Sequence, residues 1–462
     1  MQTGFDIAAD LDTPVSAYLK LAPFGPRFLL ESVEGGERLA RYSFIGFGRG
    51  LDIRLHGALL RVGTEDVRLN GGGPTELLDA LRVALKRAPA PEAPGVEVPL
   101  AGGLVGVTGF EAVRRFERLP APANRSSSEP DGAWFAPGSV LVFDHLSRRA
   151  ALLHDGPESD RTELRDQVAR ALRGPLPDRA AAGASGGPVA SFSQSEFEAA
   201  IRRVQEHISA GDVFQLVLSI RFEAETDLAP FEVYRALRLL NPSPYMYFFE
   251  FDDTAVVGSS PEALVRLQGR RASLRPIAGT RPRGASAEDD LRLERELLAD
   301  PKENAEHVML VDLARNDLGR VAVPGSIEVA PFRAVERYSH VMHMVSGTEG
   351  VLAPGKDGFD LFAAAFPAGT VVGAPKIRAI EIIDQLEPVS RGLYAGTVGY
   401  FGGGGNVDQA ITIRTLVFRN GRVAYQAGAG IVADSSPERE FEEIHAKSAV
   451  LSSALRLASE GL

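Results

Sequence analysis

The 462-residue chain contains no cysteine. This absence excludes disulfide bonds, thiolate metal sites, iron–sulfur clusters and every mechanism that uses a cysteine nucleophile. No uninterrupted run of 18 apolar residues occurs, and residues 1–10 lack the basic and apolar segments of a targeting peptide. We therefore expect a cytoplasmic protein that does not enter a membrane.

The chain also has fewer basic than acidic residues. Fifty lysine and arginine residues stand against 61 acidic residues, which gives a net charge of −11, and no long basic run is present. Because binding to a phosphate backbone needs a basic face, the sequence argues against a nucleic-acid partner. An anionic small molecule would need a local arginine, a helix N-terminus or a metal ion.

The organisation of the chain is that of an ordinary globular protein, with 44% hydrophobic and 24% charged residues. Residues 176–192 are rich in glycine, proline and alanine, which predicts a linker between an N-terminal region, 1–175, and a C-terminal domain, 193–462. Strands in hairpins followed by helices, without a regular βαβ alternation, predict an α+β fold.

Several local patterns predict individual elements. Ser193 and Glu196 form a capping box, Asn420-Gly421 is a strong hairpin signal, and Pro437 follows Ser436 as the first residue of a helix. The predicted elements are a helix over 193–211, a strand over 214–222, hairpin strands over 407–418 and 422–427, and a helix over 436–457.

Two pairs of glutamates have helical spacing. Glu303 and Glu306 lie three residues apart, as do Glu440 and Glu443, so each pair shares one face of a predicted helix. Two such pairs converging on one site would suit a hard divalent cation such as Mg²⁺. A solvated helix surface explains the spacing as well, because Glu443 could simply pair with Lys447. The spacing leaves both interpretations open.

The glycine-rich segments do not predict a nucleotide site. Residues 428–433 fit a GxGxxA pattern, but no βαβ unit follows, and residues 369–376 lack the Gly-Lys-Ser/Thr of a phosphate loop. The backbone N–H groups of Gly428 to Gly430 could still bind a carboxylate.

Two further side chains could be either structural or functional. His343 lies among apolar neighbours, which is typical of a satisfied core histidine, yet histidine is also the natural general base at neutral pH. Arg414 interrupts an apolar strand pattern, so it should be paired either within the protein or with an anionic ligand.

A set of long motifs runs in order from Leu29 to Ser448. By these motifs the chain resembles the chorismate-binding enzymes, and within them the anthranilate synthase component I family. The motifs are LLESVEGGERLARYSFIG from Leu29, NPSPYM from Asn241, PIAGTRPRG from Pro276, EHVMLVDLARNDLGR from Glu306, FPAGTVVGAPK from Phe366, GLYAGTVGY from Gly392, AITIRT from Ala410 and QAGAGIVADS from Gln426.

The resemblance implies a large α/β sandwich of antiparallel sheets between helices, with 193–462 as the chorismate-binding catalytic domain. It also implies Mg²⁺ held directly by Glu306 and Glu443, and through water by Glu303 and Glu440. The implied substrate contacts are Arg414, Tyr394, the amides of Gly428, Ala429 and Gly430, and also Gly279, Thr280 and Lys447.

The resemblance also implies roles in the reaction. Glu262 corresponds to the general acid that protonates a leaving hydroxyl, which requires a raised pKa. His343 corresponds to the histidine linked to pyruvate elimination, and Thr370 is a candidate for orienting the substrate. Related enzymes that add water carry a lysine base where this chain has Gln215, and those with a lysine nucleophile carry it where this chain has Ala278. Of these ways to attack the ring, the resemblance therefore leaves the direct addition of ammonia for this chain.

The resemblance also implies a partner subunit and an inhibitor. Glutamine amidotransferases of class I use a cysteine nucleophile, so the ammonia would come from a separate glutamine amidotransferase subunit. Tryptophan would bind as a feedback inhibitor at Ser32, Pro244, Tyr245 and Met246, and the N-terminal region 1–175 would contribute to that site. Packing between the two regions is the alternative explanation for these four residues.

Three other functions are compatible with parts of the sequence. The chain could stop at the aminated intermediate, 2-amino-2-desoxyisochorismate, although relatives that do so usually carry a fused glutaminase. It could be a non-catalytic regulator that binds tryptophan, although Glu262, His343 and Arg414 are intact. A glycosidase using two carboxylates is disfavoured by the ordered motifs.

Overall fold

The structure is a computed structural model that describes residues 4–32, 41–70, 73, 75–120, 129–177, 183–337 and 341–462. The α-helices in these ranges are α1 (Pro14–Lys20), α2 (Thr75–Arg87), α3 (Glu158–Arg173), α4 (Gln194–Ser209), α5 (Pro230–Leu240), α6 (Ala287–Ala299), α7 (Pro301–Gly319), α8 (Gly358–Ala365), α9 (Lys376–Leu386) and α10 (Pro437–Glu460). Short 3₁₀ helices are η1 (Ala22–Phe24), η2 (Phe110–Arg115) and η3 (Gly369–Val371).

The first eight strands lie before the predicted linker and the others within or after it. They are β1 (Ile7–Ala8), β2 (Phe28–Glu31), β3 (Tyr42–His56), β4 (Leu59–Val62), β5 (Glu65–Arg68), β6 (Gly103–Thr108), β7 (Gly132–Asp144), β8 (Arg149–His154), β9 (Val189–Ala190), β10 (Gln215–Glu225), β11 (Tyr245–Phe251), β12 (Thr254–Ser260), β13 (Ala263–Gln268), β14 (Arg271–Leu274), β15 (Ile277–Pro282), β16 (Glu328–Val329), β17 (Ala334–Arg337), β18 (Val341–Val345), β19 (Thr348–Val351), β20 (Gly373–Ala374), β21 (Thr397–Gly402), β22 (Val407–Ile411), β23 (Thr415–Arg419) and β24 (Arg422–Ile431).

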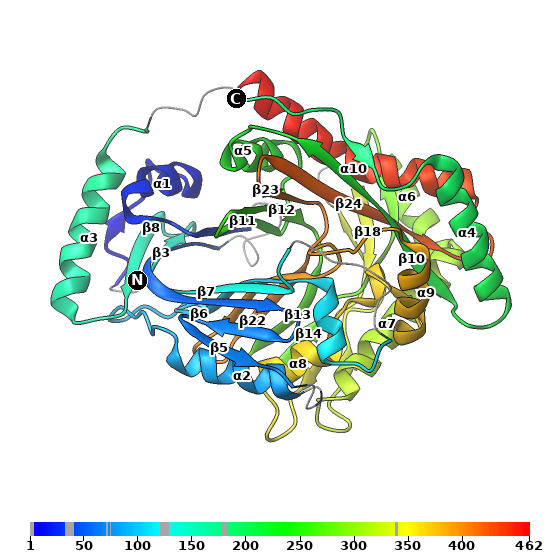
Figure 1. Ribbon diagram of the computed structural model, residues 1–462, viewed down its shortest axis with the longest axis horizontal. Coiled ribbons are helices and arrows are strands. Elements are labelled where there is room, and N and C mark those ends of the chain that lie inside the picture. The colour runs from blue at the N-terminus through cyan, green and yellow to red at the C-terminus, as the bar shows by residue number, and fades with distance from the viewer. Residues whose placement is uncertain are drawn as a thin grey trace.

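The strands form a large sheet of 21 strands and a small sheet of three, β15, β18 and β17. Helices surround the large sheet: α1 and α3 lie at one end, α5 and α10 along one side, and α2 and α8 along the opposite side (Figure 1). The neighbouring strands pair antiparallel, which confirms the predicted α+β fold of antiparallel sheets between helices. Within the described residues, no helix is long and apolar enough to cross a membrane.

Strands from both sides of the predicted linker share the large sheet at two places. β2 pairs with β11, with Glu31 opposite Met246, and β6 pairs with β21, with Thr108 opposite Thr397. Residues 178–182 of the linker and residues 33–40 of the first motif lie outside the described residues. The end of the linker adds the short strand β9, which pairs with β10.

Most of the predicted elements are confirmed. Ser193 and Glu196 make the reciprocal hydrogen bonds of a capping box at the start of α4. Asn420 and Gly421, with φ angles of 50° and 72°, form the turn between β23 and β24. Helix α10 begins at Pro437, as predicted, and continues three residues beyond the predicted end, to Glu460.

The prediction of one strand over 407–418 was wrong. β22 ends at Ile411 and β23 begins at Thr415. Arg414 has a φ of 50°, a left-handed conformation that a continuous strand cannot contain. The chain turns here because β22 pairs with β21 and β13, whereas β23 pairs with β12 and β24.

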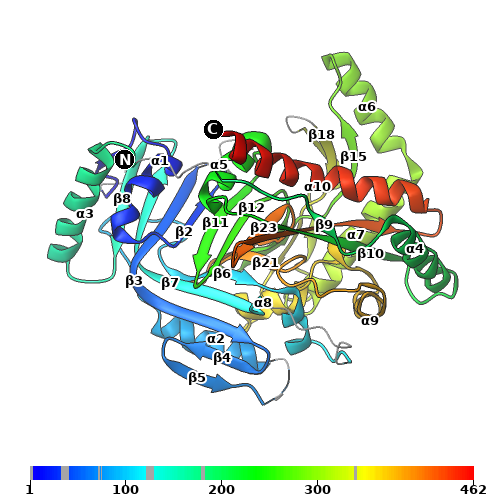
Figure 2. The same cartoon turned by 45° about the horizontal axis from the view of Figure 1, so that its top comes forward.

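The small sheet projects from the main body together with α6 (Figure 2). Its apolar contacts are Met342 and Met344 of β18 packed around Leu297 of α6. Because β15 pairs antiparallel with β18, Thr280 lies directly opposite His343. The pairing thus brings together two residues that are 63 positions apart in the sequence.

Candidate active site

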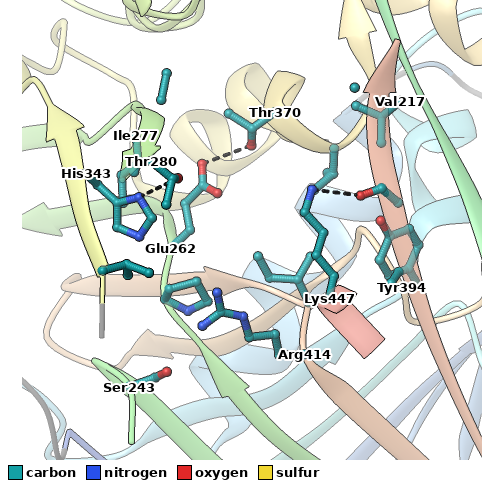
Figure 3. A pocket seen from close by; sticks show the side chains of 18 of the residues that line it. Val217, Ser243, Glu262, Ile277, Thr280, His343, Thr370, Tyr394, Arg414 and Lys447 are labelled. Atoms are coloured by element: carbon teal, nitrogen blue, oxygen red, sulfur yellow. Dashed lines mark hydrogen bonds between the residues drawn. The ribbon is translucent and has the colours of Figure 1, made fainter. Parts of the chain in front are cut away.

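A cavity of about 380 Å³ lies where β10, β24, α7 and the small sheet meet. It collects side chains from segments that are far apart in the sequence (Figure 3). The residues proposed from the sequence that line it are Glu262, Thr280, Glu306, His343, Thr370, Tyr394, Arg414, Gly428, Gly430 and Lys447.

Glu262 lies in the short turn between β12 and β13 and points into the cavity (Figure 3). Its carboxylate oxygen Oε1 accepts a hydrogen bond of 2.9 Å from the Thr370 hydroxyl. Burial raises the pKa of the Glu262 carboxyl to about 7, and the hydrogen bond from Thr370 partly opposes this shift. A group with this pKa can give up a proton at neutral pH.

His343 lies on the cavity wall formed by the small sheet, half-buried rather than enclosed in a core. Its Nδ1 lies 3.0 Å from the Thr280 hydroxyl and 3.3 Å from the Gly279 carbonyl oxygen. A carbonyl oxygen only accepts hydrogen bonds, so this contact favours the tautomer with the proton on Nδ1. That tautomer carries its lone pair on Nε2, through which the imidazole can accept a proton.

Two cationic side chains point into the same cavity. Arg414 extends from the turn between β22 and β23, where its backbone carbonyl accepts a hydrogen bond of 3.1 Å from the Ser259 N–H (Figure 3). Lys447 comes from α10, and its Nζ lies 3.0 Å from the Gly428 carbonyl oxygen. These two groups bring positive charge to the cavity in a protein whose net charge is −11.

The glycines of β24 form another wall of the cavity. A Cβ on Gly428 would lie 2.6 Å from the Tyr394 hydroxyl and 3.1 Å from the Leu218 carbonyl oxygen, so this position has little room for a side chain. A Cβ on Gly430 would lie 2.6 Å from Gln215 Nε2, so the Gln215 side chain would have to move. Because the Gly428 carbonyl binds Lys447, the backbone groups of Gly428 point away from β10. Because backbone groups alternate in direction along a strand, the N–H and C=O of Gly430 also point away from β10, whereas those of Ala429 face β10.

The four glutamates lie within the first two turns of α7 and α10. Glu306 lines the cavity and accepts a hydrogen bond of 3.1 Å from Gln215 Nε2. Burial raises the pKa of the Glu306 carboxyl, and the negative charges of Glu303 and Glu443 raise it further. Burial also raises the pKa of Glu440.

Two of these glutamates make ion pairs with nearby cations. Glu303 Oε1 lies 2.8 Å from Arg281 Nη1, and Glu443 Oε1 lies 2.6 Å from Lys447 Nζ. The second pair is the one that the helical spacing allowed. In the described part of the chain, no group of three or more histidine, aspartate or glutamate side chains is arranged to hold a metal ion.

A second cavity, of about 130 Å³, lies at the β2–β11 pairing. It is lined by all four residues proposed for tryptophan: Ser32, Pro244, Tyr245 and Met246. The Ser32 hydroxyl oxygen is buried and has no hydrogen-bond partner among the described residues, while the Tyr245 hydroxyl donates to Asp408 at 3.0 Å. Pro244 lines both cavities.

Some predicted residues do not line the main cavity, and some lining residues were not predicted. The residues predicted for substrate or metal that do not line it are Gly279, Ala429, Glu303, Glu440 and Glu443. The lining residues without a predicted role in this cavity include Asn241, Ser243, Val217 and Gln426. The NPSPYM motif, which includes the first two, was connected only with the second cavity.

The cavity brings the Glu262 carboxyl, the His343 imidazole and two cationic side chains together, as an enzyme site for a small molecule does. The model of the chorismate binding enzyme family matches residues 26–453. Since this match covers most of the chain, the chain belongs to the chorismate binding enzymes.

Within this family, the chain is similar to proteins named anthranilate synthase component 1. Anthranilate synthase component 1 of Thermus thermophilus is 47% identical and covers 98% of this chain and 97% of its own length. The protein of the same name from Pseudomonas aeruginosa is 44% identical over 99% of this chain and 96% of its own length. The crystal structure of anthranilate synthase component I from Streptococcus pneumoniae superposes with a TM-score of 0.80 at 34% identity, covering 89% of this chain and 92% of that one.

Proposed function

We propose that the chain is the aminating subunit of an anthranilate synthase, which catalyses the first step of tryptophan biosynthesis. It converts chorismate and ammonia to anthranilate, pyruvate and water. The observation that supports this proposal most strongly is the meeting of Glu262, with a pKa of about 7, and the cations Arg414 and Lys447 in one cavity. The cavity offers a proton donor beside groups that bind carboxylates, which is what a dicarboxylate with a leaving hydroxyl requires.

The side chains divide the chemistry between them. Ammonia attacks C2 of the ring as the C4 hydroxyl leaves, and Glu262 protonates that hydroxyl so that it departs as water. Thr370 fixes the orientation of the Glu262 carboxyl by its hydrogen bond. His343 then accepts the proton lost from the ring as the C–O bond to the enolpyruvyl group breaks, which releases pyruvate and makes the ring aromatic.

The cavity favours ammonia over other nucleophiles. Gln215 and Ala278 line it at the positions where relatives carry a lysine base or a lysine nucleophile. The Gln215 amide cannot activate water at neutral pH, and it already donates a hydrogen bond to Glu306. The Ala278 side chain has no nucleophilic atom.

Mg²⁺ is part of the proposal, with Glu306 and Glu443 as direct ligands and Glu303 and Glu440 binding through water. These groups offer only oxygen donors, which Mg²⁺ prefers. The charges of Glu303 and Glu443 already act unfavourably on a negative Glu306, and a divalent cation would relieve that repulsion. When bound, the ion supplies positive charge for the ring carboxylate of chorismate. Equilibrium dialysis would measure Mg²⁺ binding directly, and Glu306→Gln should weaken it.

A partner subunit and an inhibitor complete the proposal. Because the chain has no cysteine, glutamine hydrolysis belongs to a separate glutamine amidotransferase subunit that delivers ammonia. L-Tryptophan acts as a feedback inhibitor in the second cavity, where the Ser32 hydroxyl, without a partner in the part of the chain that the structure describes, is available to a polar ligand. Pro244 belongs to the walls of both cavities and offers a route by which occupation of one affects the other.

The nitrogen source tests this proposal. The purified chain is mixed with chorismate and Mg²⁺, and anthranilate fluorescence is followed with ammonium, with glutamine alone and with a chelator. We expect product with ammonium only and its loss on chelation. Product from glutamine alone would contradict the separate glutaminase, and a rate unaffected by chelation would contradict the metal.

A further inference from the structure

A fully buried ion pair lies directly behind the wall of the main cavity. The side chains of Arg391 and Glu387 are each 1% exposed. Arg391 Nε donates to Glu387 Oε2 at 3.0 Å and Nη2 donates to Oε1 at 2.7 Å. This bidentate geometry fixes the plane of the guanidinium group.

Arg391 also binds the backbone of two segments of the wall. Nη1 donates to the Val371 carbonyl at 2.7 Å and Nη2 donates to the Val217 carbonyl at 2.8 Å. Both valines line the cavity, one at the end of η3 and the other on β10. Val371 directly follows Thr370, whose hydroxyl donates to Glu262, so Arg391 holds the peptide next to the residue that orients the general acid.

Glu387 extends these contacts, through Ser219 of β10, to a third segment, β24. Its Oε1 accepts hydrogen bonds from the Ser219 backbone N–H at 2.9 Å and from the Ser219 hydroxyl at 2.6 Å. The same hydroxyl oxygen accepts a bond of 2.8 Å from Gln426 Nε2 on β24, and Gln426 lines the cavity. The guanidinium also lies over the ring of Tyr394, 5.6 Å from its centroid.

We infer that Arg391, held in place by Glu387, is a positioning residue for the reaction, which sets the orientation of Glu262 through Val371 and Thr370. This inference rests on the proposed function. Stability alone is a weak reason for such a pair, because apolar residues of similar volume often stabilise a core as well as a buried ion pair does. A planar fork bound to two separate wall segments, η3 and β10, fixes their relative position, and catalysis is sensitive to displacements of about 1 Å.

The variant Arg391→Lys tests this role. Lysine keeps the positive charge beside Glu387 but cannot bind the carboxylate and two carbonyls in one plane. We expect kcat for anthranilate formation to fall on the order of tenfold to a hundredfold. We expect KM for chorismate to change by less than about threefold, because the Tyr394 N–H bonds to the Arg391 backbone carbonyl, which the substitution keeps.

A double-mutant cycle with Thr370→Val distinguishes positioning from a general loss of structure. If Arg391 acts through Thr370, adding Arg391→Lys to the Thr370→Val variant lowers kcat by much less than it does in the wild type. Losses that simply multiply, or a kcat unchanged in Arg391→Lys, would overturn the inference.

A second buried arginine provides a matched control. Arg54 also donates to two backbone carbonyls and to the carboxylates of Asp252 and Asp52, and none of these partners lines the cavity. Arg54→Lys should lower the melting temperature and leave kcat of the folded enzyme at the wild-type value.

If Arg391→Lys does not fold, the double variant Arg391→Met with Glu387→Leu replaces the pair by apolar groups and should fold. We then expect the same loss of kcat, and wild-type kcat in this variant would overturn the inference. Anthranilate formation by the wild type in the same assay tests the proposed function separately, because the inference concerns only the ratio of variant to wild type.

Discussion

At the scale of single residues, Glu262 has the most specific role. Its pKa of about 7 means that the protonated, proton-donating form is lost as the pH rises above neutrality. We expect kcat to fall through this range when the concentration of free ammonia is held constant. Glu262→Gln cannot donate this proton and should lower kcat by roughly 10² to 10⁴. The pH profile of kcat for both proteins checks this.

Thr370→Val provides the matched variant for this profile. The hydrogen bond from Thr370 holds the pKa of Glu262 below the value that burial alone would give. Its removal should shift the alkaline limb of the profile to higher pH. A limb that stays in place in Thr370→Val, or that persists in Glu262→Gln, would show that another group titrates.

The same residue should affect stability. A carboxyl whose pKa rises from 4.5 to about 7 on folding binds its proton more tightly in the folded state, so stability falls as the pH rises through this interval. Above this interval, the free energy of unfolding is lower by roughly 3 kcal/mol than below it. Glu262→Gln should therefore gain free energy of unfolding over the wild type at pH 8 but not at pH 4. Denaturant titrations at both pH values measure this, and equal differences at the two would contradict the burial of this carboxyl.

At the scale of elements, the β2–β11 pairing brings Ser32 and the segment Pro244–Met246 to the second cavity. Tryptophan bound there would pair with the buried Ser32 hydroxyl, and losing one such bond costs about 1 kcal/mol. Ser32→Ala should weaken inhibition by tryptophan by about fivefold to tenfold without lowering the uninhibited rate. Ser159→Ala on the surface of α3 serves as control, and inhibition unchanged in Ser32→Ala would place the site elsewhere.

Local elements were predictable from the sequence because their signals are local. The capping box of α4, the Asn420-Gly421 turn and the start of α10 each depend on neighbouring residues. The break at Arg414 depends instead on which strands lie beside β22 and β23, and no local pattern shows that.

The candidate site was predictable where the family resemblance assigns a role to a residue. Glu262, His343 and Arg414 line one cavity although 152 positions separate the first from the last. Arg391 and Glu387 could not be predicted, since a Glu-Arg pair four residues apart is typical of a solvated helix face. Only the packing of three wall segments around them makes this pair a fully buried one.

At the scale of the whole molecule, the two parts of the chain share one sheet. The β2–β11 and β6–β21 pairings join residues before and after the predicted linker, and one core cluster contains side chains from both parts. Unfolding either part would expose strand edges of the other. We therefore expect one cooperative thermal transition by calorimetry, whereas two separate transitions would show that the parts are energetically independent.

The identity of the products distinguishes an anthranilate synthase from an enzyme that stops at the aminated intermediate. The most direct measurement incubates the chain with chorismate, Mg²⁺ and ¹⁵N-ammonium and quantifies all products by mass spectrometry. We predict one ¹⁵N-anthranilate and one pyruvate for each chorismate consumed. Consumption of chorismate with an aminated product but no pyruvate would show that the reaction stops at the intermediate, and no consumption at all would contradict the proposed activity.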